Sequence, residues 1–199
     1  MNIFKEHEIK NLVLIGSTKS GKTTLAETMM FEGGVINRRG TVEEKNTISD
    51  YHVIEHDRGN SVYATSLHTE WRGTKLNIID TPGFDDFIGE VVSSIRVADT
   101  CIMLINAKSG VEVGTELHWN HIQNYSKPML LAVNSLDHTR SDFELAISGI
   151  KESFGNAVTL MQYPVNQGEG FNKIIDLLKM VMYVFPPNGG KPKKVPIPE

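Results

Sequence analysis

The feature that most constrains this chain is a glycine-rich segment near its N-terminus. Residues 16–23 read GSTKSGKT and match the pattern G-x-x-x-x-G-K-[ST]. An apolar run over residues 11–15 precedes the segment, and a helical pattern over residues 23–32 follows it. In this strand–loop–helix setting, backbone N–H groups and the positive end of a helix converge on one anion. The sequence therefore predicts a phosphate-binding loop.

The residue types in this loop have distinct expected roles. Lys22 can reach the β- and γ-phosphates of a nucleotide, and the Thr23 hydroxyl can bind Mg²⁺. A glycine-rich turn retained for structure or interaction is the alternative interpretation. The predicted nucleotide contacts in this region are Ser17, Thr18, Lys19, Ser20, Gly21, Lys22, Thr23 and Thr24.

The remainder of the chain alternates between strand-like and helix-like segments, which is typical of a parallel sheet with crossover helices. Residues 34–60 show no hydrophobic periodicity of a helix or a strand. A stretch of that length indicates either a functional moving part or disorder. Around a hairpin turn at Arg72-Gly73 we expect one antiparallel strand. The expected strands are 62–71, 75–79, 101–105 and 129–133, and the expected helices are 85–98, 112–125 and 140–154.

Composition and charge exclude several classes of protein. The chain has 199 residues, with 20 Lys+Arg against 24 Asp+Glu, and this acidic balance argues against direct DNA binding through bulk charge. Its apolar runs are far shorter than the ~20 residues of a membrane span, and the first residues lack the apolar core of a signal peptide. The single cysteine, Cys101, fits a reducing compartment. We expect a cytoplasmic globular protein without membrane contact.

Two further motifs follow strand-like runs. Asp80 ends the run 77–80 and precedes Thr81-Pro82-Gly83, so its carboxylate can hold Mg²⁺ while the Gly83 N–H bonds a γ-phosphate. Asn134 and Asp137 follow the strand 129–133, and the Asp137 carboxylate can accept hydrogen bonds from two donors on the guanine edge. Each motif alone is more often an ordinary turn. Their order behind a phosphate loop favours a nucleotide-switch GTPase.

The motifs in this order resemble the GTP-binding domain of translational GTPases, and in detail that of elongation factor G, over residues 11–143. The resemblance implies an α/β P-loop GTPase domain, with a mostly parallel sheet, helices on both faces and one antiparallel strand. It implies GTP and GDP as ligands, Mg²⁺ as cofactor and the ribosome as partner. Arg58-Gly59-Asn60-Ser61 resembles the end of the family's first switch, so the resemblance places Ser61 on Mg²⁺ and makes residues 34–60 a mobile loop.

Three positions depart from the family pattern. Phe84 replaces the histidine that orients the attacking water, and a phenyl ring cannot position water by conventional hydrogen bonds. Lys19 stands where the family usually has Asp, and Ser135 replaces the lysine whose stem lies along the base. We therefore expect a divergent GTPase of protein synthesis with slow hydrolysis. A GTP-binding regulatory module that never hydrolyses is the alternative.

The C-terminal third leaves the domain organisation open. The chain contains no Ser-Ala dipeptide, which the resemblance places in the family's remaining guanine loop, after an inserted subdomain. We expect residues 1–156 to form the GTP-binding domain. Residues 157–185 are then either the start of that insert, in a fragment of a longer protein, or the end of a small domain. In the second case they form a last strand (157–163) and a last helix (171–182). Residues 186–199 hold five of the eight prolines and are expected to be linker-like.

Overall fold

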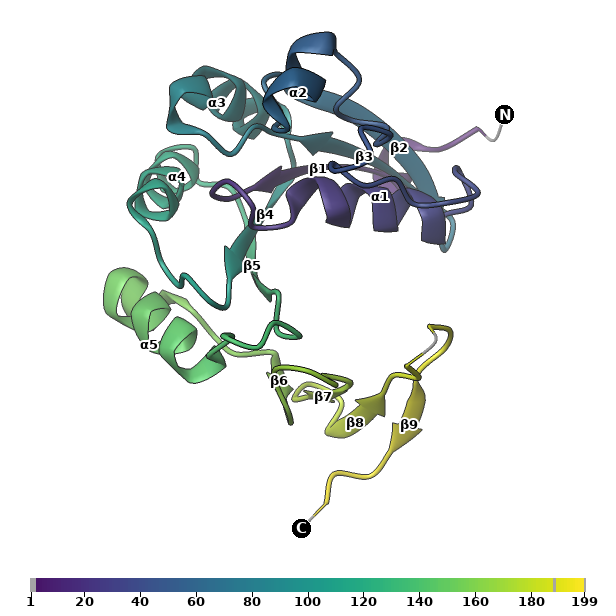
Figure 1. Ribbon diagram of the computed structural model, residues 1–199, viewed down its shortest axis with the longest axis vertical. Helices are drawn as coiled ribbons and strands as arrows, with labels where there is room; N and C mark the ends of the chain where they lie inside the picture. The colour runs from purple at the N-terminus through teal and green to yellow at the C-terminus, as the bar shows by residue number, and fades with distance from the viewer. Residues whose placement is uncertain (1–2, 188, 199) are drawn as a thin grey trace. The chain divides into compact units, whose positions relative to one another are not determined.

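The computed structural model describes residues 3–187 and 189–198. The chain divides into two compact units. Figure 1 colours the chain from purple at the N-terminus to yellow at the C-terminus. The first unit comprises Met1–Ile105 and Glu112–Ala132, and the second comprises Asn106–Val111 and Val133–Glu199.

The first unit is built on a five-stranded sheet with the strand order β2-β3-β1-β4-β5. Strand β1 runs parallel to β3 and β4, whereas β2 is antiparallel to β3. This mixed sheet confirms the expected fold class. The strand bounds are β1 (Ile9–Ile15), β2 (Thr65–Trp71), β3 (Thr74–Asp80), β4 (Thr100–Asn106) and β5 (Met129–Asn134).

A tight hairpin joins β2 to β3. Trp71 pairs with Thr74, and the two residues between them, Arg72 and Gly73, have φ of 50° and 78°. Positive φ at both central residues defines a type I′ turn, whose twist matches that of the flanking strands. The turn therefore sits where the sequence predicts it, and it sends β3 back so that Asp80 ends beside Leu14 of β1.

Neighbouring residues of β1 point to opposite faces of this sheet. Both faces therefore carry apolar side chains, and helices cover each of them. Val13 and Ile15 pack with residues of α3 and α4 on one face, while Leu14 packs with Ala26 and Met30 of α1 on the other. The helix bounds are α1 (Lys22–Glu32), α2 (Val53–Arg58), α3 (Ile88–Val97) and α4 (Val113–Asn124), with short 3-10 helices at Glu6–Glu8 (η1) and Asp85–Phe87 (η2).

The second unit contains one long helix and a small antiparallel sheet. Asp142 caps the N-terminus of helix α5 (Phe143–Phe154), and its carboxylate accepts the Leu145 N–H at 2.9 Å. A 3-10 turn, Gly155–Ala157 (η3), follows the helix. The sheet has the order β6-β7-β8-β9, with bounds β6 (Gln162–Pro164), β7 (Lys173–Asp176), β8 (Val181–Val184) and β9 (Lys193–Val195).

The helix considered for residues 171–182 is wrong, because strands β7 and β8 occupy this region. The Asp176 carboxylate accepts the backbone N–H groups of Leu178 and Lys179 at 3.1 and 3.0 Å, and Met180 has φ of 50°. Asp at the start of a turn and a residue in the left-handed region favour a hairpin over a helix. Within the expected linker, β9 pairs with β8, while residues 188 and 199 lie outside the described part of the chain.

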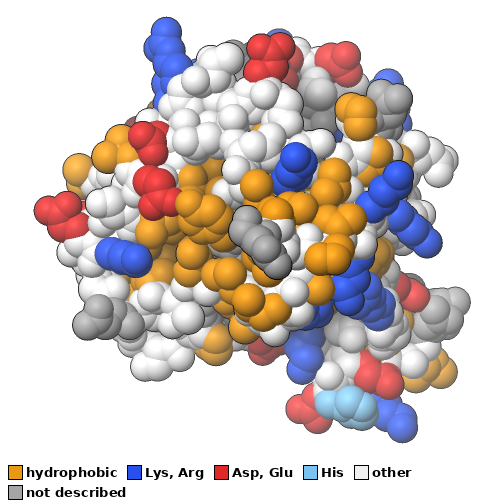
Figure 2. Space-filling view, turned by 90° about the horizontal axis from the view of Figure 1, so that it is seen from below, with side chains coloured by type: hydrophobic (Ala, Val, Ile, Leu, Met, Phe, Trp, Pro, Cys, Tyr) orange, Lys and Arg blue, Asp and Glu red, His pale blue; other side chains and the backbone are white. Residues whose placement is uncertain are grey.

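No helix in residues 3–187 and 189–198 has the length and apolarity needed to cross a bilayer. On the face drawn in Figure 2, basic and acidic side chains are interspersed around exposed hydrophobic ones.

Candidate nucleotide-binding site

The phosphate loop connects β1 to α1 through backbone conformations that favour glycine. Gly16 and Gly21 have φ of 148° and 98°, and Lys19 adopts φ of 63°. A Cβ atom at position 16 would lie 2.4 Å from the Leu104 carbonyl oxygen, so only glycine lets the loop leave β1 this close to β4. The loop therefore curls back on itself before Lys22 begins the helix.

Lys22 lies buried under this loop. Its Nζ donates hydrogen bonds to the carbonyl oxygens of Gly16 at 2.8 Å and Ser17 at 3.0 Å. Burial lowers the pKa of Lys22 to about 8, an effect that the carboxylates of Asp80 and Asp50 oppose. The ammonium group is thus held at the centre of the loop, where it can meet a phosphate group.

Gly83 packs directly against the phosphate loop. A Cβ atom at this position would lie 2.6 Å from Lys22 Nζ and 2.7 Å from the Thr18 backbone nitrogen. The Thr18 backbone cannot move as a side-chain end can, so this approach requires glycine. The structure therefore brings Gly83 and the loop together, as the Asp-Thr-Pro-Gly motif implies.

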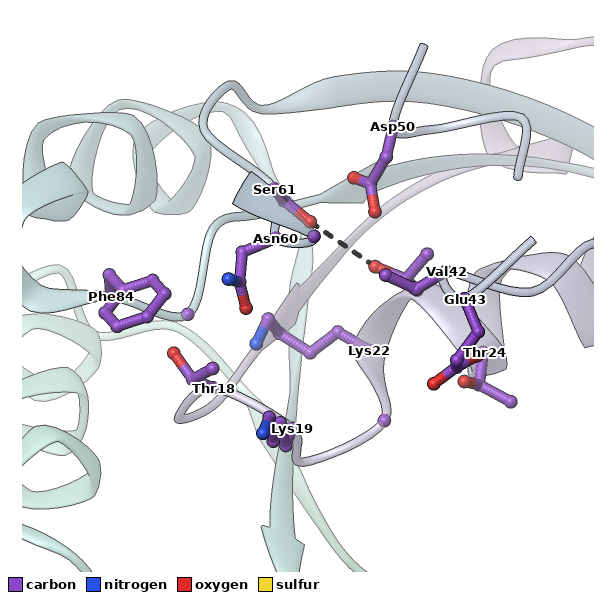
Figure 3. A pocket seen from close by; sticks show the side chains of 14 residues that line it. Thr18, Lys19, Lys22, Thr24, Val42, Glu43, Asp50, Asn60, Ser61 and Phe84 are labelled. Atoms are coloured by element: carbon purple, nitrogen blue, oxygen red, sulfur yellow. Dashed lines mark hydrogen bonds between the residues drawn. The ribbon is translucent and has the colours of Figure 1, made fainter. Parts of the chain in front are cut away.

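Hydroxyl and carboxylate oxygens from three segments gather beside Lys22. The Thr23 and Ser61 hydroxyl oxygens lie 3.4 Å apart (dashed line in Figure 3). Asp80 is 1% exposed, and burial raises its pKa to about 6, against the lowering effect of the Lys22 charge. The Ser49 and Thr23 hydroxyls also lower this pKa, although neither completes a hydrogen bond of good geometry with the carboxylate. Oxygen donors of this kind suit Mg²⁺.

Sequence reasoning missed Asp50, which lines the same pocket. Asp50 is buried, its Oδ2 has no hydrogen-bond partner among the described residues, and burial raises the pKa of its carboxyl group. His56 holds the backbone at this point through a 2.8 Å contact between its Nε2 and the Asp50 carbonyl oxygen. Asp50 lies in the aperiodic stretch 34–60, where no spacing or motif singled it out.

Buried Glu55 fixes the end of this stretch. Its carboxylate accepts the backbone N–H groups of Val62 at 3.0 Å, Tyr63 at 3.2 Å and His52 at 3.1 Å. Helix α2 is therefore tied to the segment that follows it, and Ser61 is held in place beside Thr23.

The pocket formed by these segments has a volume of about 400 Å³. Ser17, Ser20 and Asp80 are not among the residues that line it, and Ser20 and Asp80 are buried. The pocket is lined by Thr18, Lys19, Gly21, Lys22, Thr23, Thr24, Val42, Glu43, Asp50, Gly59, Asn60, Ser61, Gly83 and Phe84.

Phe84 stands at one side of this pocket, opposite Val42 and Glu43 in Figure 3. Its side chain is 42% exposed. The hydroxyl of Thr18 points toward the ring, which offers no donor or acceptor for a conventional hydrogen bond.

Asn134 and Asp137 lie in the second unit. The Asn134 carbonyl oxygen accepts the Ala107 N–H at 2.8 Å, which fixes the end of β5. Ser135 follows with φ of 61°, and the Leu136 carbonyl oxygen accepts the Gly168 N–H at 2.7 Å. Backbone hydrogen bonds from Ala107 and Gly168 thus hold the loop, and the Asp137 side chain is exposed.

Comparison with known proteins decides the family. Residues 7–187 match the model of the elongation factor Tu GTP-binding domain. This chain belongs to that family.

Relatives and solved structures agree with this assignment. The chain is 34% identical to the elongation factor G-like protein of Thermotoga maritima, over 96% of the chain and 27% of that protein. It is 34% identical to elongation factor G of Mycoplasma pneumoniae, over 96% and 28%. A crystal structure of a protein from Thermus thermophilus superposes with a TM-score of 0.88 at 28% identity, over 96% of this chain and 28% of that one. The chain spans little more than a quarter of the curated relatives it matches.

Proposed function

We propose that this domain binds GTP and GDP with Mg²⁺, hydrolyses GTP slowly, and acts on the ribosome as part of an elongation-factor-G-like protein in the cytoplasm. The observation that carries the proposal is the clustering of Lys22, Thr23 and Ser61 around one glycine loop. Two segments far apart in the sequence meet there, and each contributes a group that nucleotide phosphates or Mg²⁺ would use.

The phosphate groups would bind between the loop backbone and Gly83. Lys22 supplies a positive charge that is already desolvated, so a charge-assisted hydrogen bond to phosphate costs little further reorganisation. The start of α1 adds the positive end of the helix dipole.

Mg²⁺ would be held by Thr23, Ser61 and Asp80, with Asp50 close to the same position. The unpartnered oxygens of the buried Asp80 carboxylate support this assignment, because a buried carboxylate without partners is unfavourable unless it binds a ligand or is protonated. The ion would neutralise the β- and γ-phosphates of the nucleotide.

Guanine preference rests on Asn134 and Asp137. A carboxylate accepts hydrogen bonds from the paired donors of guanine, which adenine does not present. Ser135 lacks the aliphatic stem that would lie along the base, so we expect guanine selectivity with reduced stacking.

Slow hydrolysis follows from Phe84. A group that positions water or removes its proton contributes about 10²–10⁴-fold to rate, and a phenyl ring supplies neither function. The same observation favours the second candidate function, a regulatory module that holds GTP without hydrolysing it.

Titration calorimetry with GTP, GDP and ATP, with and without Mg²⁺, tests the proposal. We expect both guanine nucleotides to bind more tightly than ATP, and Mg²⁺ to strengthen GTP binding. Lys22→Ala should weaken binding about 100-fold, because a buried charge-assisted contact is lost. Lys151→Ala, which removes an exposed lysine of α5, is the matched control. Equal affinity for ATP and GTP would contradict the guanine preference. Unchanged binding by Lys22→Ala would show that the glycine loop is not the phosphate site.

A further inference from the structure

Helix α4 buries a histidine that the proposed nucleotide site does not use. His118 is 1% exposed, and neither of its ring nitrogens has a hydrogen-bond partner among the described residues. Buried polar atoms are rarely left unpaired in proteins, so an imidazole with two orphaned nitrogens needs an explanation.

Charged and titratable groups from three elements face this imidazole. They are Lys22 of α1, Asp85 of η2, and His121 of α4 itself. Burial, the Lys22 charge and His121 lower the pKa of His118 to about 4, whereas the Asp85 carboxylate acts in the opposite direction. The ring is therefore neutral near pH 7, held between a cation that disfavours its protonation and an anion that favours it.

Gly114, one helical turn before His118, lets the Asp85 carboxylate rest against α4. A Cβ atom at position 114 would lie 2.9 Å from Asp85 Oδ1 and 3.7 Å from Ser17 Oγ. The hydroxyl oxygen of Ser17 is itself buried without a partner. The phosphate loop, the segment after Phe84 and the first turns of α4 thus meet at one place.

We propose that Asp85 and His118 are the two halves of a latch that fixes the second switch (residues 83–87) to helix α4 when the phosphate loop holds a nucleotide. The proposal rests on the proposed function, because it needs nucleotide phosphate beside Lys22. His118 would act here as a positioning residue, since in the latch it bonds Asp85 of the switch and not the nucleotide.

Charge compensation supplies the coupling. Phosphate bound at Lys22 offsets the cation that disfavours protonation of His118, so the imidazole takes up a proton from solvent. The imidazolium then donates a charge-assisted hydrogen bond to the Asp85 carboxylate, which already lies against Gly114. Phe84 directly precedes Asp85, so the latch also sets the position of the ring that replaces the family's histidine.

Proton uptake on nucleotide binding tests the latch with a readout that a merely structural role would not move. GTP binding is measured by calorimetry near pH 6 in buffers of different ionisation enthalpy. The wild-type chain should bind a fraction of a proton more than His118→Gln and Asp85→Asn do, a difference between chains that is independent of any proton that Asp80 releases in all of them. Asp86→Asn, the neighbouring exposed carboxylate, is the matched control and should leave the uptake unchanged. A proton count that equals the wild-type value in either Asp85→Asn or His118→Gln overturns the proposal.

A double-mutant comparison completes the test. Each single variant should weaken GTP binding roughly tenfold, because one charge-assisted hydrogen bond is lost. The double variant should be no weaker than either single one, because both act on the same contact. Additive losses contradict the latch.

Asp85 is exposed, so Asp85→Asn keeps the test valid if His118→Gln fails to fold. A wild-type chain that binds no nucleotide contradicts the proposed function itself, whereas normal wild-type binding with unaffected variants contradicts the latch alone.

Discussion

The hydroxyl oxygens of Thr23 and Ser61 lie 3.4 Å apart, although 38 positions separate the two residues in the sequence. Thr23 belongs to the first turn of α1, and Ser61 follows α2 at the end of the long aperiodic stretch. The contact closes that stretch onto the phosphate loop. A ligand that binds both hydroxyls would therefore hold the whole segment in an ordered conformation, and loss of the ligand would release it. An order–disorder switch operates in this way.

Removal of the Ser61 hydroxyl should separate the two nucleotide states. We expect Ser61→Ala to weaken Mg²⁺–GTP binding roughly tenfold and GDP binding much less, because the hydroxyl is proposed to sense the triphosphate-bound ion. Fluorescent-nucleotide titration in Mg²⁺ measures both affinities. Ser66→Ala, an exposed serine of β2, serves as the control. An equal loss for GTP and GDP would exclude Ser61 from the switch.

The approach of Gly83 to the phosphate loop predicts a steric effect. Gly83→Ala places a methyl group 2.7 Å from the Thr18 backbone nitrogen, so the loop or the second switch must shift. We expect weakened GTP binding and a loss of about 1–3 kcal/mol in the free energy of unfolding. Chemical denaturation and nucleotide titration check both effects.

Gly89 in α3 offers a matched control for that variant. A Cβ atom there would meet nothing within 4 Å. Gly89→Ala should keep GTP affinity and should not destabilise the domain, since alanine favours a helix. If Gly83→Ala and Gly89→Ala have the same GTP affinity and the same free energy of unfolding, the close approach at Gly83 does not matter for binding or stability.

The buried imidazole of His118 predicts acid sensitivity of the nucleotide-free domain. Its pKa is about 4 in the folded chain and near 6.5 in the unfolded chain, so the unfolded state binds the extra proton between these values. Stability is therefore fully present above pH 6.5 and falls as pH approaches 4, by roughly 3 kcal/mol from this group. Urea denaturation across this range measures the loss, and His118→Leu should reduce it. An unchanged slope in His118→Leu would contradict the burial argument.

The parts of the fold that the sequence predicts are those where local chemistry and tertiary structure agree. The apolar run of β1 is buried at Val13, Leu14 and Ile15, and Gly16 and Gly21 after it adopt the positive φ that lets the chain turn. The Arg72-Gly73 hairpin follows for the same reason. The mapping of Ser61 beside Thr23 came from family resemblance, because no spacing rule links residues so far apart.

The parts that the sequence did not predict depend on long-range contacts. Ile174, Ile175 and Leu178 have helical spacing, yet pairing of β7 with β6 and β8 makes the segment a hairpin. Helix α2 is only six residues long and is held by the buried Glu55 carboxylate, which leaves no periodic signal. Asp50 gains its place in the pocket from the same folded loop.

The rate of GTP hydrolysis tests the account most directly. Single-turnover hydrolysis is measured for the wild-type chain, Phe84→His and Lys19→Ala, with and without ribosomes, at saturating GTP. Lys19 is included because its ammonium group, on the pocket wall, could stabilise developing charge on the phosphates. We predict slow wild-type turnover despite bound GTP, and an increase of about 10²–10⁴-fold in Phe84→His, where a group able to orient water is restored. Fast wild-type turnover that survives Lys19→Ala would contradict the account, because another residue would then position the water.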